Sequence, residues 1–156
     1  MRKRCTLRLP TDVASLAYMA GILDGEGTIT IKQCKGKKGT SNGYSVQVLV
    51  FNTDEGLMVW LEDKFSGLLT EKKGVASGNR KCYVWWLSGE LAGQLLEVLL
   101  PYLKIKAKQA ELAIRFLDHG RGKANGRRHP ADFTSERAGM VQTMRLLQCR
   151  KTAVGE

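Results

Sequence analysis

Two acidic residues separated by one glycine follow an apolar stretch and are the residues best suited to chemistry. Asp24 and Glu26 lie in Asp24-Gly25-Glu26-Gly27, at the end of a helix that the apolar spacing predicts over residues 13–24. Carboxylates at a helix C-terminus are disfavoured, because carbonyl oxygens already make that end negative. A divalent cation such as Mg²⁺ would relieve this repulsion and activate water for phosphodiester hydrolysis. The alternative for an acidic turn taken alone is a solvent-exposed surface turn.

The elements around these acids follow from periodicity and turn residues. Thr11 or Asp12 can cap the first helix, and Gly25 is expected to end it in a left-handed conformation. Apolar and polar residues then alternate in strands predicted over residues 28–34 and 44–51. A glycine- and lysine-rich loop over residues 35–43 joins them, so these two strands are expected to pair as a hairpin.

The remaining elements complete one domain. A helix capped by Asn52, Thr53 or Asp54 ends near Phe65, and strands follow over residues 68–73 and 81–87. Ser88 can cap a helix that Pro101 ends, and a further helix over residues 106–118 is closed by Gly120. The order αββαββα predicts an α+β fold with one antiparallel sheet and helices on one face. The expected organisation is a basic arm over residues 1–12, a core over 13–120, and a basic loop with a C-terminal helix over 121–156.

The charge balance indicates a polyanionic partner. Twenty-five Lys and Arg against fifteen Asp and Glu give a net charge of +10, which favours nucleic acid. No run of about 20 apolar residues is present, so no membrane partner is expected. The four cysteines are scattered and form no C-x-x-C motif, which is typical of free thiols in an intracellular protein. An organelle (chloroplast or mitochondrion) and a bacterial or phage cytoplasm both remain open.

Residues 16–31 carry a specific pattern. They spell Leu-Ala-Tyr-Met-Ala-Gly-Ile-Leu-Asp-Gly-Glu-Gly-Thr-Ile-Thr-Ile, and residues 20–27 resemble the LAGLIDADG signature. Met19 takes the place of the leading leucine, Gly25 that of the usual alanine and Glu26 that of the last aspartate. The resemblance implies a saddle-shaped sheet and a homing endonuclease that makes double-strand breaks in DNA with Mg²⁺ or Mn²⁺. Because the chain holds one full motif, it also implies a homodimer on a long near-palindromic target.

The same resemblance assigns roles along the first helix. In the family two such helices pack across a two-fold axis, and small residues allow a close approach. The expected dimer interface is Ala17, Ala20, Gly21 and Asp24. Glu26 is the expected metal ligand, helped by the main-chain carbonyl of Gly25, whereas Asp24 is more often structural in the family.

Two further segments match the family. Asp54, after the second strand, occupies the position where a glutamine often positions the water pocket, which gives it an expected catalytic role. The run from Pro101 to Ala110 resembles the single-motif branch, and it places Lys106 in the active site, where a cation steadies developing charge. The alternative is that Lys104, Lys106 and Lys108 only contact phosphates. Met58 stands where homodimeric relatives place a basic residue, which puts cleavage in doubt.

The family contacts DNA bases with its sheet, so the expected DNA-binding residues lie on the strands and in nearby basic turns. They are Thr28, Thr30, Lys32, Cys34, Ser45, Gln47 and, less securely, Leu49, together with Glu71, Lys73, Arg80, Tyr83, Trp85, Lys104 and Lys108. Each taken alone is more often a solvated surface residue. Arg127 and Arg128 could contact flanking DNA, or the last segment could simply pack outside the core.

Two alternative functions share this fold and its basic surface. One is an intron maturase that binds RNA, and the other is a DNA-binding regulator that has lost cleavage. The Met58 departure is compatible with both, whereas the acid at Glu26 argues against both, since a protein without cleavage has no need of a ligand there.

Overall fold

The computed structural model describes residues 7–34, 43–72, 81–120 and 131–149, with no side-chain description for residues 131–133. The predicted loops over residues 35–43 and 121–130 therefore lie largely or wholly outside the described residues. Helices and strands follow one another as α1 (Val13–Glu26), β1 (Gly27–Cys34), β2 (Gly43–Asn52), α2 (Glu55–Phe65), β3 (Leu68–Lys72), β4 (Cys82–Ser88), α3 (Glu90–Leu99), a 3₁₀ turn (Leu100–Tyr102), α4 (Ala107–Gly120) and α5 (Ala131–Gln148). The expected αββαββα order is confirmed.

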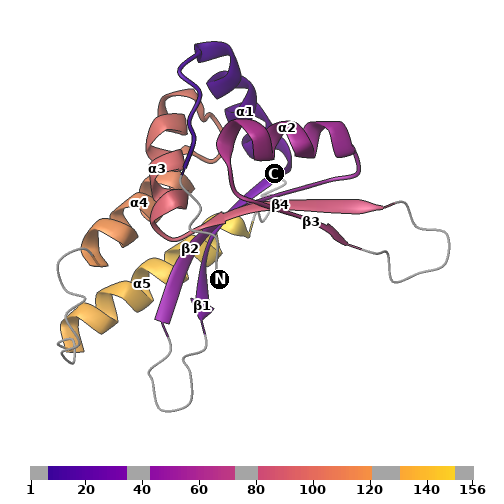
Figure 1. Cartoon of the computed structure of the whole chain (residues 1–156). Coiled ribbons are helices and arrows are strands. Elements are labelled where there is room, and N and C mark those ends of the chain that lie inside the picture. Colours follow the sequence, from indigo (N-terminus) through magenta and orange to yellow (C-terminus); the bar gives the residue numbers. More distant parts are fainter. Residues whose placement is uncertain (1–6, 35–42, 73–80, 121–130, 150–156) are drawn as a thin grey trace, which may run out of the picture.

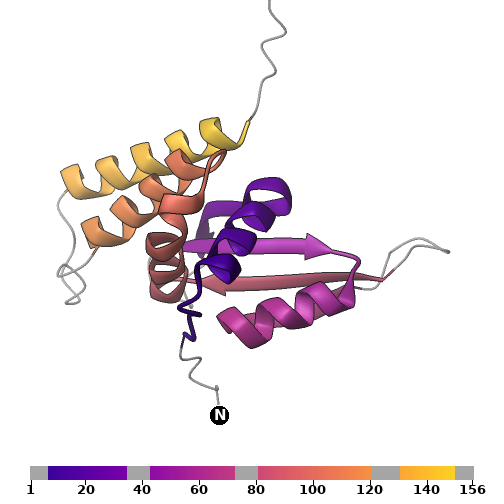
Figure 2. The same ribbon diagram turned by 90° about the horizontal axis from the view of Figure 1, so that it is seen from above.

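The four strands form one antiparallel sheet in the order β1-β2-β4-β3. Figures 1 and 2 show α1, α2 and α3 together on one face of it. The register sends the two hairpins in different directions: Gly43 of β2 pairs near the β1–β2 turn, whereas Asn52 pairs with Tyr83 near the β3–β4 turn. The described ends of the two hairpins, Cys34 with Gly43 and Lys72 with Cys82, therefore lie toward opposite ends of β2.

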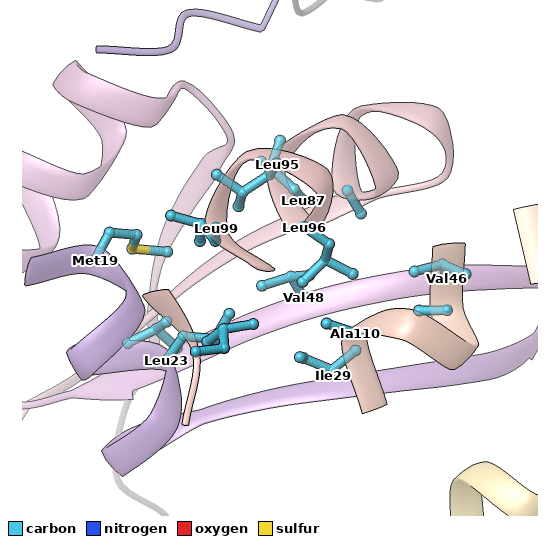
Figure 3. Packing of buried hydrophobic residues seen from close by; sticks show 14 of the residues in the cluster. Met19, Leu23, Ile29, Val46, Val48, Leu87, Leu95, Leu96, Leu99 and Ala110 are labelled. Atoms are coloured by element: carbon cyan, nitrogen blue, oxygen red, sulfur yellow. The ribbon is translucent and has the colours of Figure 1, made fainter. Parts of the chain in front are cut away.

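The core lies between the sheet and these helices, as Figure 3 shows. Met19 and Leu23 of α1 are fully buried, and so are Ile29, Val46 and Val48 of the first hairpin. The alternation predicted for both strands of this hairpin is thus confirmed. Burial of such side chains stabilises the fold by about 1.5–3 kcal/mol each, which fixes the end of α1 relative to the strands beside it.

Local signals set the helix ends, with two corrections to expectation. Asp12 caps α1 and Asp54 caps α2, each through a side-chain oxygen that accepts a backbone N–H. Gly25 does not end α1, because the helix continues to Glu26 and closes on the extended backbone of Gly27. Ser88 does not cap α3, since it ends β4, and Gly89 precedes the helix with a φ of 64°. A glycine adopts that conformation at little cost.

The C-terminal helix α5 packs against α4 and the free edge of β1. The guanidinium carbon of Arg137 lies 3.7 Å from the ring centroid of Phe116 in α4, and His119 pairs with Glu136. The amide of Gln148 donates to the carbonyl oxygen of Ile29 at 2.7 Å. An edge strand otherwise presents unpaired backbone groups, so α5 covers part of that edge. Of the residues expected in the outer segment, Arg127 and Arg128 lie outside the described residues.

Candidate active site at the end of α1

Glu26 lies at the exposed C-terminal end of α1, beside the end of β2. The side-chain amide of Asn52 donates a hydrogen bond to Glu26 Oε2. Asn52 is itself fixed, because its Oδ1 accepts the backbone N–H of Asp54 at 2.8 Å. One carboxylate oxygen of an exposed acid is thus held by a residue from another element. Asn52 was not among the expected site residues, since no local pattern shows which helix end a strand end will meet.

Asp24 occupies a different environment two residues earlier. Its carboxylate accepts backbone N–H groups from Lys104 at 2.7 Å, Ile105 at 3.2 Å and Lys106 at 2.9 Å. Burial raises the pKa of Asp24, but these hydrogen bonds outweigh it and lower the pKa below its usual value. Asp24 therefore fastens the segment before α4 to the end of α1, in agreement with the structural role that the resemblance implied.

Lys106 joins the same helix end from the opposite side. Its ammonium donates to the carbonyl oxygen of Leu23 at 2.8 Å and also to that of Asp24. Both carbonyls lie in the last turn of α1, where the Leu23 oxygen also accepts the N–H of Gly27, and a cation there offsets the negative end of the helix dipole. The structure places Lys106 at the end of α1 that carries Glu26, so a positive charge lies close to the candidate site.

An open groove of about 430 Å³ runs along the exposed side of α1 to Glu26. It is lined by Ala17, Tyr18, Gly21, Ile22, Gly25, Glu26, Asn52 and Leu57. A second depression of about 520 Å³ adjoins it, and Tyr18, Asn52 and Leu57 line both. Glu26 supplies a carboxylate to this groove, and most of its other lining residues are apolar or small.

The structure bears on two expectations for the start of α2. Asp54 directs Oδ1 to the backbone N–H of Leu57 at 2.8 Å, so it acts as a helix cap, and Asn52 is the residue that contacts Glu26. Met58 is fully buried in the core. Its side chain does not face the site, and Leu57, one residue earlier, lines the groove instead. The helical phase of α2 directs the Met58 side chain into the core, so a cation at this position would not face the candidate site.

The exposed side of α1 is apolar and made of small residues. Ala17 and Gly21 are exposed, whereas Ala20 is fully buried in the core. A Cβ atom added at Gly21 or Gly25 would meet nothing within 4 Å, so packing inside this chain does not require a glycine at either position. The expected place of Ala20 in a dimer interface is wrong, because Ala20 is fully buried in this chain, whereas the place of Asp24, bound here by the segment before α4, stays a prediction.

The outer face of the first hairpin is as expected. Thr28, Thr30 and Lys32 point away from the helix-covered face, since they alternate with the buried Ile29 and Ile31. The register pairs Thr28 with Leu49, Thr30 with Gln47, Lys32 with Ser45 and Cys34 with Gly43. Lys104 and Lys108 are also exposed. The hairpin residues form a polar surface on the side of the sheet opposite to α1, whereas Lys104 precedes α4 beside the end of α1 and Lys108 lies in α4.

In the second hairpin, the side chains that were expected on the outer face of the sheet belong to the helix-covered face. Trp85 is fully buried and donates to the Ser66 carbonyl oxygen at 2.6 Å, and Tyr83 is also buried. Glu71 pairs with Tyr83 and so belongs to the helix-covered face, although its side chain is exposed. A shift of one residue moves a whole strand's side chains to the other face. The outer face holds Leu68, Thr70, Lys72, Cys82, Val84 and Trp86, and the expected Lys73 and Arg80 lie outside the described residues.

The oxygen donors at the end of α1 suit a hard cation. One carboxylate oxygen of Glu26 is not bonded to Asn52, and the carbonyl of Gly25 is adjacent in sequence. Within the described ranges, no group of three or more His, Cys, Asp or Glu side chains could hold a metal ion. Mg²⁺ is commonly held by one or two carboxylates with waters and substrate phosphates. One chain therefore supplies part of such a site.

Comparison with known proteins places this fold. No family model matches the chain, and no curated protein matches it by sequence. Solved structures do match: the homing endonuclease I-CvuI in complex with its target has a TM-score of 0.70 and 20% identity, over 89% of this chain and 85% of that one. The archaeal intron-encoded homing endonuclease I-Vdi141I, complexed with DNA, has 0.68 and 10%, over 92% and 89%.

A third match carries the signature in its name. The LAGLIDADG homing endonuclease I-GzeII, in complex with a DNA target, has a TM-score of 0.62 and 15% identity, over 84% of this chain and 45% of that one. In the described part of the present chain, no helix is long and apolar enough to cross a membrane. From α1 to α5, the chain has the LAGLIDADG homing-endonuclease fold.

Proposed function

We propose that this chain is a homodimeric, site-specific endonuclease that makes double-strand breaks in a long near-palindromic DNA target. The observation that carries the proposal is the end of α1, where Glu26, Asn52 and Lys106 converge beside an exposed apolar helix face. A net charge of +10 favours a nucleic acid partner. The matching structures with DNA targets support the same class of substrate.

The homodimer is supported by the residues that the single chain leaves uncovered. Along α1, Val13 is 62% exposed and Tyr18 is 56% exposed, and they flank Ala17 and Gly21. A helix that is apolar on all sides is usually buried on all sides. A second copy of α1 packed there would cover these residues and bring two Glu26 carboxylates near each other.

Glu26 is proposed as the ligand of a divalent cation, Mg²⁺ or Mn²⁺, with the Gly25 carbonyl. When bound, the cation would supply charge stabilisation and an activated water at the phosphodiester. Asn52 holds one carboxylate oxygen and so fixes the direction of the other. Lys106 keeps the helix end stable beside this negative charge. Asp54 keeps a proposed part in positioning, through the cap that orients α2.

The polar surface of the first hairpin is proposed to contact base edges, with Lys or Arg suited to guanine and Gln to adenine. Its residues are Thr28, Thr30, Lys32, Cys34, Ser45 and Gln47, and Lys104 and Lys108 would contact phosphates. Lys73 and Arg80 remain proposed contacts, whereas Glu71 is not one, because it lies on the helix-covered face and pairs with Lys81. Tyr83 and Trp85 are not proposed to contact DNA, because both are buried.

A DNA-binding regulator without cleavage is the second candidate. Leu57, an apolar residue, lines the groove that contains Glu26, where a cation would aid phosphate chemistry. An RNA maturase on the same fold shares the basic surface, and a structured intron RNA offered as competitor would identify it.

The deciding experiment is cleavage selection from a randomised duplex library with Mg²⁺ and, in parallel, with Ca²⁺. Double-strand cuts at one near-palindromic site, with Mg²⁺ but not Ca²⁺, are expected. Specific binding without cuts in either metal would favour the regulator, and the absence of any selected DNA would refute the proposal.

A further inference from the structure

The outer face of the sheet changes from polar to apolar along the strands. The register defines successive rows across it: Lys32 with Ser45; Thr30 with Gln47 and Ser88; Thr28 with Leu49, Trp86 and Leu68; Phe51 with Val84 and Thr70; and Cys82 with Lys72. The first two rows are polar, whereas the next two are dominated by apolar side chains. Rows lie about 7 Å apart, because two strand residues separate them.

We define the apolar patch as Leu49, Phe51, Leu68, Val84 and Trp86. Phe51 is 40% exposed and Leu68 is 50% exposed, while Val84 is buried beneath them. Helices α1, α2 and α3 lie on the opposite face, as Figure 2 shows. Exposed large apolar side chains gathered on one sheet face indicate a binding surface.

A lysine borders the patch. The ammonium of Lys72 lies 5.6 Å from the centroid of the Phe51 ring, and both side chains are exposed. Lys81, just before β4, alternates onto the other face and pairs with Glu71 at 3.5 Å. An apolar patch bordered by the Lys72 cation suits a ligand with apolar groups inside a phosphate frame. The major groove of DNA offers that combination through the C5-methyl group of thymine.

The patch also lies near the candidate catalytic acid. Phe51 directly precedes Asn52, whose amide holds Glu26. Lys32 and Ser45 lie near the turn of the first hairpin, at the other end of β2. Bases over the patch would therefore be closer to the cleaved bonds than bases over the polar rows. Two patch rows span about 7 Å, which corresponds to about two base-pair steps of 3.4 Å.

We propose that the apolar patch recognises thymine by its methyl group, at the positions of each half-site nearest the cleaved bonds. The inference rests on the proposed function and adds a base class to it: hydrogen-bond recognition over the polar rows and methyl recognition over the apolar patch. A second copy of this chain is the other occupant that apolar residues would suit. The exposed side of α1 already offers a surface for that copy.

The test replaces thymine by deoxyuridine, one position at a time, in the duplex selected by the wild-type protein. This change removes the methyl group and keeps every hydrogen-bonding group. Binding is measured with Ca²⁺, so the readout does not depend on cleavage. Substitution at the half-site positions nearest the cleaved bonds is expected to weaken binding about fourfold per methyl group, which is the contribution of one buried carbon.

The double variant Phe51→Thr with Leu68→Thr should bind thymine and deoxyuridine duplexes equally at those positions. Gln47→Ala is the matched control: it should change base preference over the polar rows and keep the deoxyuridine effect. Deoxyuridine without effect on wild type, or an effect that persists in the double variant, would overturn the inference. So would a double variant that loses dimerisation while retaining the methyl preference. If the wild-type protein selects no DNA, the proposed function itself fails. If it selects DNA but shows no deoxyuridine effect, only the methyl inference fails.

Discussion

Asp24 and Glu26 are two carboxylates at one helix end with opposite environments. Asp24 receives three backbone N–H groups and joins two parts of the chain. Glu26 is exposed and receives a single amide from Asn52. A carboxylate with its hydrogen bonds satisfied by backbone contributes to stability, whereas one left open to solvent near a groove is free to bind a ligand. Two acids of one motif thus divide into a structural and a functional residue.

The largest expected effect is on cleavage. Glu26→Gln should lower the rate of cutting by about a thousandfold or more, since a metal ion supplies several kcal/mol of transition-state stabilisation. DNA binding and the unfolding temperature should stay unchanged, because Glu26 is exposed. Glu62→Gln, another exposed glutamate, is the control for loss of one charge. Cleavage retained in Glu26→Gln would remove Glu26 from the metal site.

Asp24→Asn should show the reverse pattern. An amide nitrogen in place of one carboxylate oxygen would face backbone donors, and loss of charged hydrogen bonds costs about 2 kcal/mol. Urea unfolding should report that decrease in the free energy of unfolding. Asp12→Asn is the matched control, because asparagine caps a helix as well as aspartate does. Equal stability of the two variants would show that Asp24 does not fasten α4 to α1.

Asn52→Ala should lower the affinity for a divalent cation at Glu26, without removing the carboxylate itself. Loss of a residue that orients a ligand typically weakens metal affinity by about 10–100-fold. Calorimetry with Mn²⁺ on the protein–DNA complex would measure it, with Gln47→Ala as a control on the same strand. Unchanged Mn²⁺ affinity would mean that the Asn52 contact serves folding alone.

The smallest expected effect is on the stability of the fold at acid pH. The pKa of Asp24 is lowered in the folded chain from its usual 3.8, so its stabilisation is fully present above that unfolded value. It is lost as the pH falls below 3.8 through the folded pKa, because the unfolded chain takes up the proton first. Between pH 5 and pH 3, Asp24→Asn should lose less stability than wild type. Parallel curves for the two proteins would contradict this assignment.

The sequence predicted most of the fold and only part of the site. Strict alternation in Ile29, Ile31, Val46 and Val48 identified the faces of the first hairpin. In β4, residues 82–87 form a nearly continuous apolar run, and a run without alternation does not show which side is buried. The face of that strand was therefore misjudged by one residue.

Other features depended on contacts between distant residues. The role of Asn52 requires the end of β2 to meet the end of α1, and the role of Asp24 requires residues 104–106 to fold back 80 positions along the chain. Leu57 and Met58 are both apolar neighbours, so only the phase of α2 in the folded chain decides which one lines the groove.

Double-strand cleavage by this chain requires above all a second copy that covers α1 and brings two Glu26 carboxylates together. Gly21→Phe tests this directly, because a side chain at Gly21 has open space in the single chain. Gly139→Phe is the matched control, an exposed helical glycine with equal open space on α5. Sedimentation should find wild type and Gly139→Phe at twice the mass of one chain, and Gly21→Phe folded at the mass of one. A dimeric Gly21→Phe, or a wild-type monomer that cuts both strands, would contradict it.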